Sequence, residues 1–226
     1  MKSYELIVFD WDGTLMDSEL RIVTCMQRAA RDTANPVPAE HEVREIIGLS
    51  MHKAVQRLFP EVERQGVETV IEAYREHWLG EEVPASALFP DAENVIEGLV
   101  DAGYLLAVAT GKSRRGLDKV LAESGLGDRF HATRCADEAF SKPHPQMLKD
   151  ILTDLNTGPE RALVIGDTEY DMQMAANARV DALGVDYGAH AAQRLIDTGA
   201  LQVLGGLAEL PPWLKQQTQQ GVEQSA

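Results

Sequence analysis

The sequence predicts an α/β protein in which an all-helical segment interrupts a doubly wound, mostly parallel sheet. Three observations lead to this fold class. Short apolar segments alternate with amphipathic helical stretches, as in βαβ units. Residues 18–80 show helical patterns alone. Polar residues directly follow several of the apolar segments. The expected strands are 5–9, 104–109, 161–166 and 181–185, and the expected helices are 92–101, 114–124, 145–155 and 170–178.

Length and charge limit the classes of function. The chain has 226 residues and a formal net charge of −15, which would repel a nucleic-acid backbone or an anionic membrane surface. Cys25 and Cys135 form no spacing motif, and the N-terminal segment has no apolar signal core. We therefore expect a cytoplasmic protein, monomeric or a small homo-oligomer, that binds a small molecule and has no nucleic-acid or membrane partner.

The helical segment directly follows the first expected strand, which indicates an insertion. Ser18 is suited to cap a helix that begins at Glu19. The expected domains are 1–16 with 86–226, which form the sheet, and 17–85, which forms the helical insert. The polar, Gln-rich tail after about residue 213 is expected to fray.

Two acids follow the first expected strand. The run ELIVF ends at Asp10, and Asp12 comes two residues later, before a Gly-Thr turn. Two carboxylates at one sheet edge can share a metal ion and divide nucleophilic and acid/base work. A plain turn that contains Asp-Gly explains part of the pattern equally well.

Two further motifs follow at positions that the predicted topology brings to the same edge. Thr110-Gly111-Lys112 follows the expected strand 104–109 and offers a hydroxyl and backbone N–H groups to an anion, although a helix cap explains it as well. Lys142 precedes Pro143-His144-Pro145, where the flanking prolines stiffen the loop. An ammonium held there could balance carboxylates and a phosphoryl group, although an exposed lysine in a turn is the simpler reading.

A fourth motif, Gly166-Asp167-Thr168-Glu169-Tyr170-Asp171, follows the expected strand 161–166. Asp171 has an alternative explanation as a helix-start acid, whereas an acid directly after a buried strand needs a partner. Carboxylates, a hydroxyl and an ammonium at one edge are the groups that phosphoryl transfer with Mg²⁺ requires. Their joint occurrence favours that chemistry over four separate structural explanations.

DWDGTL, Thr110, Lys142 and GDTEYD, in this order, resemble the four motifs of the haloacid dehalogenase-like (HAD) hydrolase superfamily. The helical insert resembles the cap of its phosphoglycolate phosphatase and β-phosphoglucomutase branch. The resemblance implies a Rossmann-like core with a helical cap. It also implies that Asp10 is the nucleophile that forms an aspartyl-phosphate and that Asp12 protonates the leaving alkoxide and then activates water. Thr110, Gly111 and Lys142 would bind phosphoryl oxygens.

The resemblance also implies Mg²⁺ as the cofactor. Its protein ligands would be Asp10, the backbone carbonyl of Asp12, and Asp167. Asp171 would stand beside them as a ligand or as a support that acts through water.

Two departures narrow the branch. Asp12 argues against carbon–halogen chemistry, since dehalogenases of the superfamily lack this acid. The mutases typically carry Glu-Asp in the fourth motif, where this chain has Asp167-Thr168. A phosphatase of a small phosphomonoester metabolite is therefore favoured, with a phosphosugar mutase, a pyrophosphatase or a nucleotidase as alternatives. An alternative from another class of function is a signalling receiver domain, which accepts a phosphoryl group. It would need its phospho-accepting Asp on a later strand than the acid pair, where Thr110 stands instead.

Selection of the substrate is expected in the cap. His52 and Lys53, after the turn at Gly48, could contact a substrate carboxylate or second phosphate, or could equally be solvated helix-start residues. Arg114 and Arg115 are similar candidates. Trp11 should point away from the two acids and pack in the core, because side chains alternate along a strand.

Overall fold

The computed structural model describes residues 4–80 and 82–223. Its main sheet has six parallel strands in the order β5-β4-β1-β6-β7-β8, which confirms the α/β class with a Rossmann-like core. Four of these strands agree with the sequence expectation to within one residue at each end. The strands are β1 (Leu6–Phe9), β4 (Leu105–Ala109), β5 (Ala132–Arg134), β6 (Ala162–Gly166), β7 (Asp181–Val185) and β8 (Val203–Leu204).

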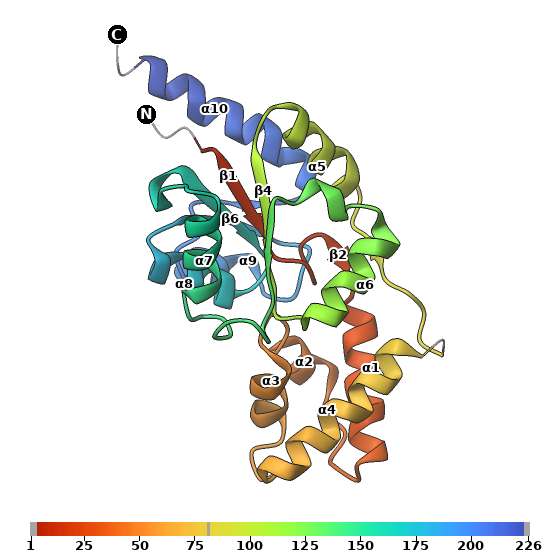
Figure 1. Ribbon diagram of the computed structural model, residues 1–226. Coiled ribbons are helices and arrows are strands. Elements are labelled where there is room, and N and C mark those ends of the chain that lie inside the picture. Colours follow the sequence, from red (N-terminus) through yellow and green to blue (C-terminus); the bar gives the residue numbers. More distant parts are fainter. Residues whose placement is uncertain (1–3, 81, 224–226) are drawn as a thin grey trace.

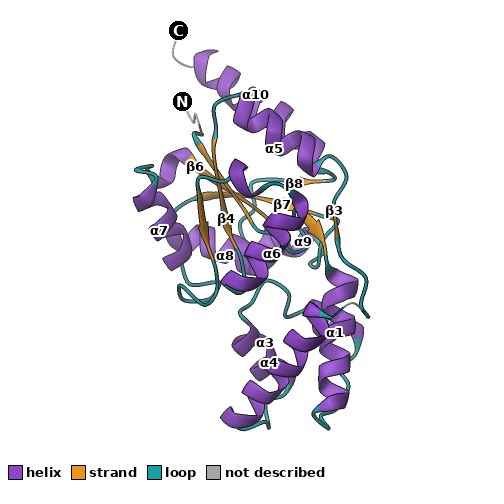
Figure 2. Ribbon diagram, turned by 45° about the vertical axis from the view of Figure 1, so that its right-hand side comes forward, coloured by secondary structure: helices purple, strands orange, loops and turns teal. Residues whose placement is uncertain are grey.

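Helices cover both faces of the sheet, and Figure 2 shows the sheet between them. One face packs against α5 (Ala92–Asp101), α6 (Arg114–Ser124) and α10 (Leu210–Glu223). The other packs against α7 (Gln146–Asp154), α8 (Glu169–Ala178) and α9 (Ala192–Asp197). Three short 3₁₀ turns lie at Gly127–Arg129, Pro159–Arg161 and Leu207–Glu209.

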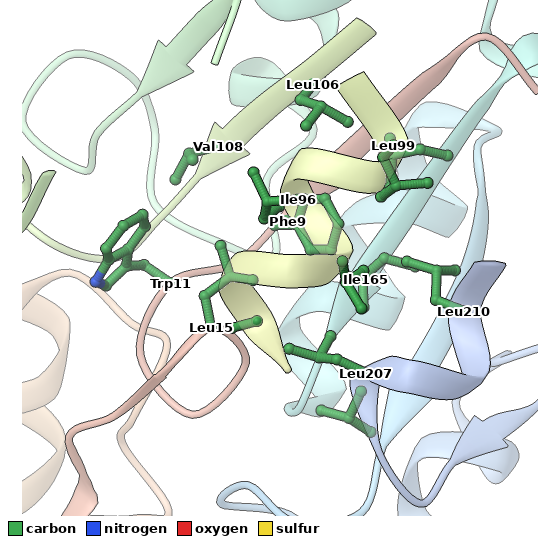
Figure 3. Close-up of a cluster of buried hydrophobic side chains, with 14 of the residues drawn as sticks. Phe9, Trp11, Leu15, Ile96, Leu99, Leu106, Val108, Ile165, Leu207 and Leu210 are labelled. Atoms are coloured by element: carbon green, nitrogen blue, oxygen red, sulfur yellow. The ribbon is translucent and has the colours of Figure 1, made fainter. Parts of the chain in front are cut away.

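The central strand β1 is buried on both sides, as parallel strands between helices are. Ile7 and Phe9 face the α5–α10 side, whereas Leu6 and Val8 face the α7–α8 side. Trp11 is fully buried in the same cluster as Phe9 (Figure 3), so the expectation that it packs in the core is confirmed.

The inserted segment forms four helices: α1 (Glu19–Asp32), α2 (Glu40–Arg44), α3 (Met51–Leu58) and α4 (Arg64–Leu79). They enclose a hydrophobic cluster of their own, which includes Met26, Val55 and Ile71. Figure 1 shows this bundle set off at one end of the sheet domain. We call it the cap, and its limits at 17 and 85 stay a prediction.

A two-stranded ribbon that the sequence analysis does not predict stands where the chain enters and leaves the cap. β2 (Met16–Asp17) pairs antiparallel with β3 (Ala87–Leu88), so that Met16 lies opposite Leu88. β5 and β8 are also absent from the expectation. Strands of two or three residues are too short for an alternating pattern, and only pairing with a neighbour defines them.

Two expectations are wrong. The tail does not fray after residue 213, because α10 continues to Glu223; Leu210, Trp213 and Leu214, spaced to share one helix face, pack into the main core and hold it. Residues 224–226 lie outside the described range. Ser18 precedes α1 but makes no side-chain cap bond there; its hydroxyl donates to Asp12 instead. Within the described residues, no helix has the length and apolar character to cross a membrane.

Candidate active site

Parallel strands bring the predicted motifs to one edge. Asp10 follows β1, and its backbone N–H donates to the carbonyl of Ile165 in β6 over 2.9 Å. Thr110 follows β4 and Asp167 follows β6, on either side of β1. The carboxyl ends of neighbouring parallel strands form the usual ligand site of such sheets. The strand order therefore explains why residues up to 157 positions apart meet here.

Lys142 joins two of the acids in the buried centre of the site. Its ammonium lies 2.9 Å from Asp10 Oδ1 and 2.6 Å from Asp171 Oδ1, and all three side chains are at most 1% exposed. Burial by itself lowers the pKa of Lys142, but Asp10 and Asp171 outweigh this effect, so its pKa lies above the usual range. The lysine is therefore held as a cation between two acids.

Asp10 presents one oxygen that the protein leaves unbound. Its Oδ1 accepts hydrogen bonds from the Trp11 backbone N–H and from Lys142. Its buried Oδ2 has no hydrogen-bond partner among residues 4–80 and 82–223. Burial raises the pKa of Asp10 well above its usual value, Lys142 lowers it, and Asp171 and Asp167 raise it further. Such an orphaned buried oxygen calls for a bound partner.

Asp167 is fixed by the loops around it. Thr14 Oγ1 donates to its Oδ1 over 2.9 Å, and the Ala189 N–H donates to its Oδ2 over 2.8 Å. Gly13, with φ of 80°, allows this approach, since a Cβ there would collide with the Asp167 carboxylate. Burial and Asp171 raise the pKa of Asp167 to about 7. Thr14 and Ala189 contact Asp167 but are absent from the predicted site residues. Thr14 lies within the DWDGTL motif, where the sequence analysis treats it only as part of a turn, and nothing in the local pattern marks Ala189.

The buried acids fit a divalent cation. Carboxylate oxygens of Asp10, Asp167 and Asp171 lie within 4.8 Å of one another. Three ionised acids against one buried lysine would leave two negative charges, which a divalent ion would neutralise. Burial is the main cause of the raised pKa values of Asp10 and Asp167, and the neighbouring carboxylates raise them further. The donor set, all oxygen, suits Mg²⁺.

Asp171 has less to offer a metal than its neighbours. Lys142 donates to its Oδ1, and the Thr168 backbone N–H and hydroxyl donate to its Oδ2 over 3.1 and 2.6 Å. The bond from the Thr168 N–H is part of a capping box at the start of α8. With both oxygens engaged, this arrangement favours the supporting role among the two that the sequence analysis left open.

Asp12 lies outside the cluster of Asp10, Asp167 and Asp171 and binds other partners. Lys112 Nζ donates to its two oxygens over 2.8 and 2.9 Å, and Ser18 Oγ donates to Oδ1 over 2.6 Å. The same ammonium lies 4.2 Å from the ring centroid of Trp78 in α4, a cation–π contact between core and cap. The sequence analysis overlooks Lys112 as a site residue, although its position two residues after Thr110 pointed to this edge.

A cavity of ≈ 660 Å³ opens above these residues, between the core and the cap. Asp10, Asp12, Thr110, Gly111 and Lys112 line it from the core side and are called the core floor. The lining residues within 22–79 are called the cap wall. A Cβ on Gly111 would lie 2.6 Å from the Leu49 carbonyl oxygen and 2.7 Å from that of Gly48. The cap turn therefore closes directly onto the second motif.

The two candidate specificity residues of the cap, His52 and Lys53, make different contacts. His52 lines the cavity, but its Nε2 lies 2.8 Å from Glu68. Lys53 instead reaches the backbone carbonyls of Ser141 and Lys142 over 3.3 and 3.4 Å, so its contacts join cap and core.

The two arginines after the second motif also differ. Arg115 lines the cavity. Arg114 is engaged with Glu138 over 2.7 Å and with Thr133 over 2.9 Å. Both bonds tie α6 to the segment around β5, which gives Arg114 a structural role.

Comparison with known proteins identifies relatives of this chain. The family model for haloacid dehalogenase-like hydrolases matches residues 7–185. A probable phosphatase, IndB, from Dickeya dadantii is 34% identical over 197 residues, which cover 84% of this chain and 84% of that protein. A phosphoglycolate phosphatase from Vibrio cholerae is 30% identical over 201 residues, which cover 83% of this chain and 87% of that protein.

Solved structures share the fold. The crystal structure of a predicted phosphoglycolate phosphatase from Haemophilus somnus has a TM-score of 0.85 at 23% identity, and the match covers 94% of this chain and 98% of that one. At this level of identity the likeness shows the architecture alone. The match to the family model and the two phosphatase relatives show the family as well. The chain therefore belongs to the haloacid dehalogenase-like hydrolase family, in its phosphoglycolate phosphatase-like branch, and is a phosphoric monoester hydrolase.

Proposed function

We propose that the chain hydrolyses a small phosphomonoester metabolite in a Mg²⁺-dependent reaction, through an aspartyl-phosphate on Asp10. The observation that carries this proposal is the state of the Asp10 carboxylate. Oδ1 is held by Lys142 and the Trp11 N–H, while the buried Oδ2 has no hydrogen-bond partner within the described residues. A nucleophile needs one oxygen oriented by neighbours and one left to react.

In the first step, Asp10 Oδ2 attacks phosphorus, and the bond between phosphorus and the leaving oxygen breaks. Lys142 and Thr110 hold phosphoryl oxygens, and the N–H of Gly111 assists. Asp12 transfers a proton to the leaving alkoxide, so the alcohol departs neutral. In-line transfer of this kind depends on positioning and charge stabilisation more than on covalent chemistry.

In the second step, Asp12 takes a proton from water, and the resulting hydroxide attacks phosphorus. The bond to Asp10 breaks, and inorganic phosphate and the free carboxylate are regenerated. Lys112 and Ser18 hold Asp12 at the cavity, where it can serve both steps.

Asp10, Asp167 and the backbone carbonyl of Asp12 would hold Mg²⁺, with Asp171 as support. When bound, the ion supplies positive charge that offsets the charge of the phosphoryl group. Asp171 contributes by fixing Lys142 and the start of α8.

Phosphate release from p-nitrophenyl phosphate and from a panel of phosphometabolites tests the proposal. The wild-type protein should release inorganic phosphate with Mg²⁺ and lose this activity on thorough chelation. Asp10→Asn should abolish release and keep its fold, because it removes a buried charge without a change of shape. Full activity of that variant would exclude Asp10 as the nucleophile. Isomerised sugar phosphate with little free phosphate would indicate a mutase instead.

A further inference from the structure

The cap wall is mostly apolar where it faces the core floor. Its apolar members come from α1, from the segment before α3 and the start of α3, and from the C-terminal half of α4. They include Ile22, Met26, Ile47, Leu49, Trp78 and Leu79. Several also belong to the hydrophobic cluster of the cap, so their side chains are held in place by packing. The cavity is therefore bounded on this side by a fixed apolar surface.

The charges on the cap wall do not form an anion site. Among the described residues that line the cavity from the cap, Arg75 and His52 are the basic ones, and Glu72 and Glu76 are acidic. Arg75 donates to Glu72 over 3.3 Å, and His52 pairs with Glu68. Apart from His52, one positive charge stands against two negative charges on this wall. Such a wall offers no excess of positive charge to a second anionic group on the substrate.

The core side offers little more positive charge beyond the phosphoryl site. Lys112 is engaged with both oxygens of Asp12. Arg115 lines the cavity together with Asp137, which adds one charge of each sign. A carboxylate that entered with the leaving group would lose its hydration, which is costly. The cations open to it, Arg75 and Arg115, are exposed, where an ion pair contributes little, and three acids (Glu72, Glu76 and Asp137) line the cavity beside them.

The volume of the cavity also favours a leaving group larger than glycolate. At ≈ 660 Å³ the cavity falls within the range of about 300–1,000 Å³ found for sites that enclose drug-sized ligands. Glycolate is a two-carbon leaving group, and it would leave most of the apolar surface exposed to water. A larger apolar leaving group would cover that surface and gain free energy from its burial.

We propose that the preferred substrates are phosphomonoesters whose leaving alcohol has an uncharged, mainly apolar body larger than glycolate. This inference rests on the proposed phosphatase function. It places phosphoglycolate, pyrophosphate and bisphosphorylated sugars among the poor substrates, because each carries a second anionic group. The phosphoryl group itself binds at the core floor, and the cap wall contacts the remainder.

Two matched pairs of esters test the preference. Hexyl phosphate and 5-carboxypentyl phosphate have leaving alcohols of similar length and acidity, and they differ by the terminal carboxylate. Ethyl phosphate and phosphoglycolate form the same pair at two carbons. With the wild-type protein and Mg²⁺, kcat/KM for hexyl phosphate should exceed that for 5-carboxypentyl phosphate by about tenfold or more, and should also exceed that for ethyl phosphate.

A charge added to the cap wall should shift this ratio. Met51 is partly buried and lines the cavity. Met51→Lys should raise the relative kcat/KM for 5-carboxypentyl phosphate by roughly tenfold, mainly through KM. Met51→Leu, which adds no charge, should leave the ratio as in the wild type. Leu79→Lys repeats the test at a more exposed position, where folding is less sensitive.

The outcomes separate the two proposals. Equal or better turnover of the carboxylate esters by the wild-type protein would overturn the apolar preference and keep the phosphatase assignment. If the wild-type protein releases phosphate from the four esters and from the metabolite panel no faster than Asp10→Asn does, the phosphatase proposal is overturned, and this inference with it. Preference for hexyl phosphate, with the expected shift in Met51→Lys, would support both.

Discussion

On the core floor, the polar residues follow parallel strands and bind one another at fixed distances, whereas the cap wall is built from helices and is largely apolar. The floor residues are marked in the sequence because they are polar at the ends of apolar strands. Residues of the wall, such as Met26 and Trp78, also form the interior of the helical bundle. The comparison teaches that reaction chemistry can be read from local motifs, whereas the surface that we propose selects the substrate consists of residues that look like ordinary core residues in the sequence.

The largest expected effect comes from breaking the buried charge network that Lys142 forms with Asp10 of the core floor and with Asp171. Lys142→Met would leave Asp10 and Asp171 without their shared cation, because Lys142 is fully buried between them. We expect a loss of about 3–5 kcal/mol in the free energy of unfolding and loss of phosphatase activity. Urea denaturation measures the first and phosphate release the second. Lys149→Met, at an exposed position of α7, is the matched control and should unfold as the wild type does.

The stabilisation that Mg²⁺ gives to the acid cluster of the core should depend on pH, whereas the apolar cap wall contributes no such dependence. The raised pKa of Asp167 means that the folded, metal-free protein holds this proton more tightly than the unfolded chain. The stability that this provides is present at low pH and is lost as the pH rises through about 7. Mg²⁺ binds the ionised form, so its stabilising effect should be greater at about pH 8 than at about pH 5.5.

At a free concentration of a hundred times Kd, the gain from Mg²⁺ should be about 2.7 kcal/mol. Thermal unfolding with MgCl₂, compared with NaCl at equal ionic strength, measures it. An equal gain at both pH values would contradict the assignment of Asp167 as a ligand whose proton the metal displaces.

Lys112 connects the two sides, and its removal should have an intermediate effect. Lys112→Met deletes two charge-assisted hydrogen bonds to Asp12 and the cation–π contact with Trp78. We expect a loss of about 1–3 kcal/mol in transition-state stabilisation and a smaller change in the free energy of unfolding. Steady-state kinetics give the former. Lys119→Met removes a surface i,i+4 pair with Glu123 and should leave kcat/KM unchanged; a similar loss in both variants would argue against a specific role for Lys112.

The smallest expected effect concerns the approach of the wall to the floor. Gly111→Ala places a Cβ against the carbonyls of Gly48 and Leu49, so the cap turn must move outward. We expect kcat/KM to fall by about tenfold with a destabilisation of about 1 kcal/mol. Gly98→Ala in α5, where a Cβ meets open space, should instead stabilise the protein by about 1 kcal/mol. Unchanged kinetics in Gly111→Ala would show that the closed contact is not needed for turnover.

Much of the fold was predictable because its signals are local. β1, β4, β6 and β7 are apolar segments between polar boundaries, and the helices between them have amphipathic patterns. The ribbon of β2 and β3, and the short strands β5 and β8, were not predictable because their residues carry no pattern of their own. The extent of α10 was misjudged because three apolar residues that pack on α5 and the sheet outweigh a polar tail.

The site shows the same division. Asp10, Lys142 and Asp167 are recognisable as polar residues at strand ends or in a stiffened loop, and the structure brings them together. The hydrogen bonds of Thr14 to Asp167 and of Ser18 to Asp12 depend on loops that cross in space. The contact partners of Lys53 and Arg114 could not be predicted either, because both are ordinary cations near helix starts.

The sequence by itself determined the reaction class, because phosphoryl transfer needs a few reactive groups and parallel strands bring their C-terminal ends to one edge. Only the tertiary structure decided which Asp10 oxygen stays unbound, which lysine serves Asp10 and which serves Asp12, and what surface faces them. These properties arise from contacts between segments that are far apart along the chain. The cap wall is the clearest case: its apolar residues pack in the interior of the bundle, and only the tertiary structure places them opposite the core floor, where we propose that they contact the substrate.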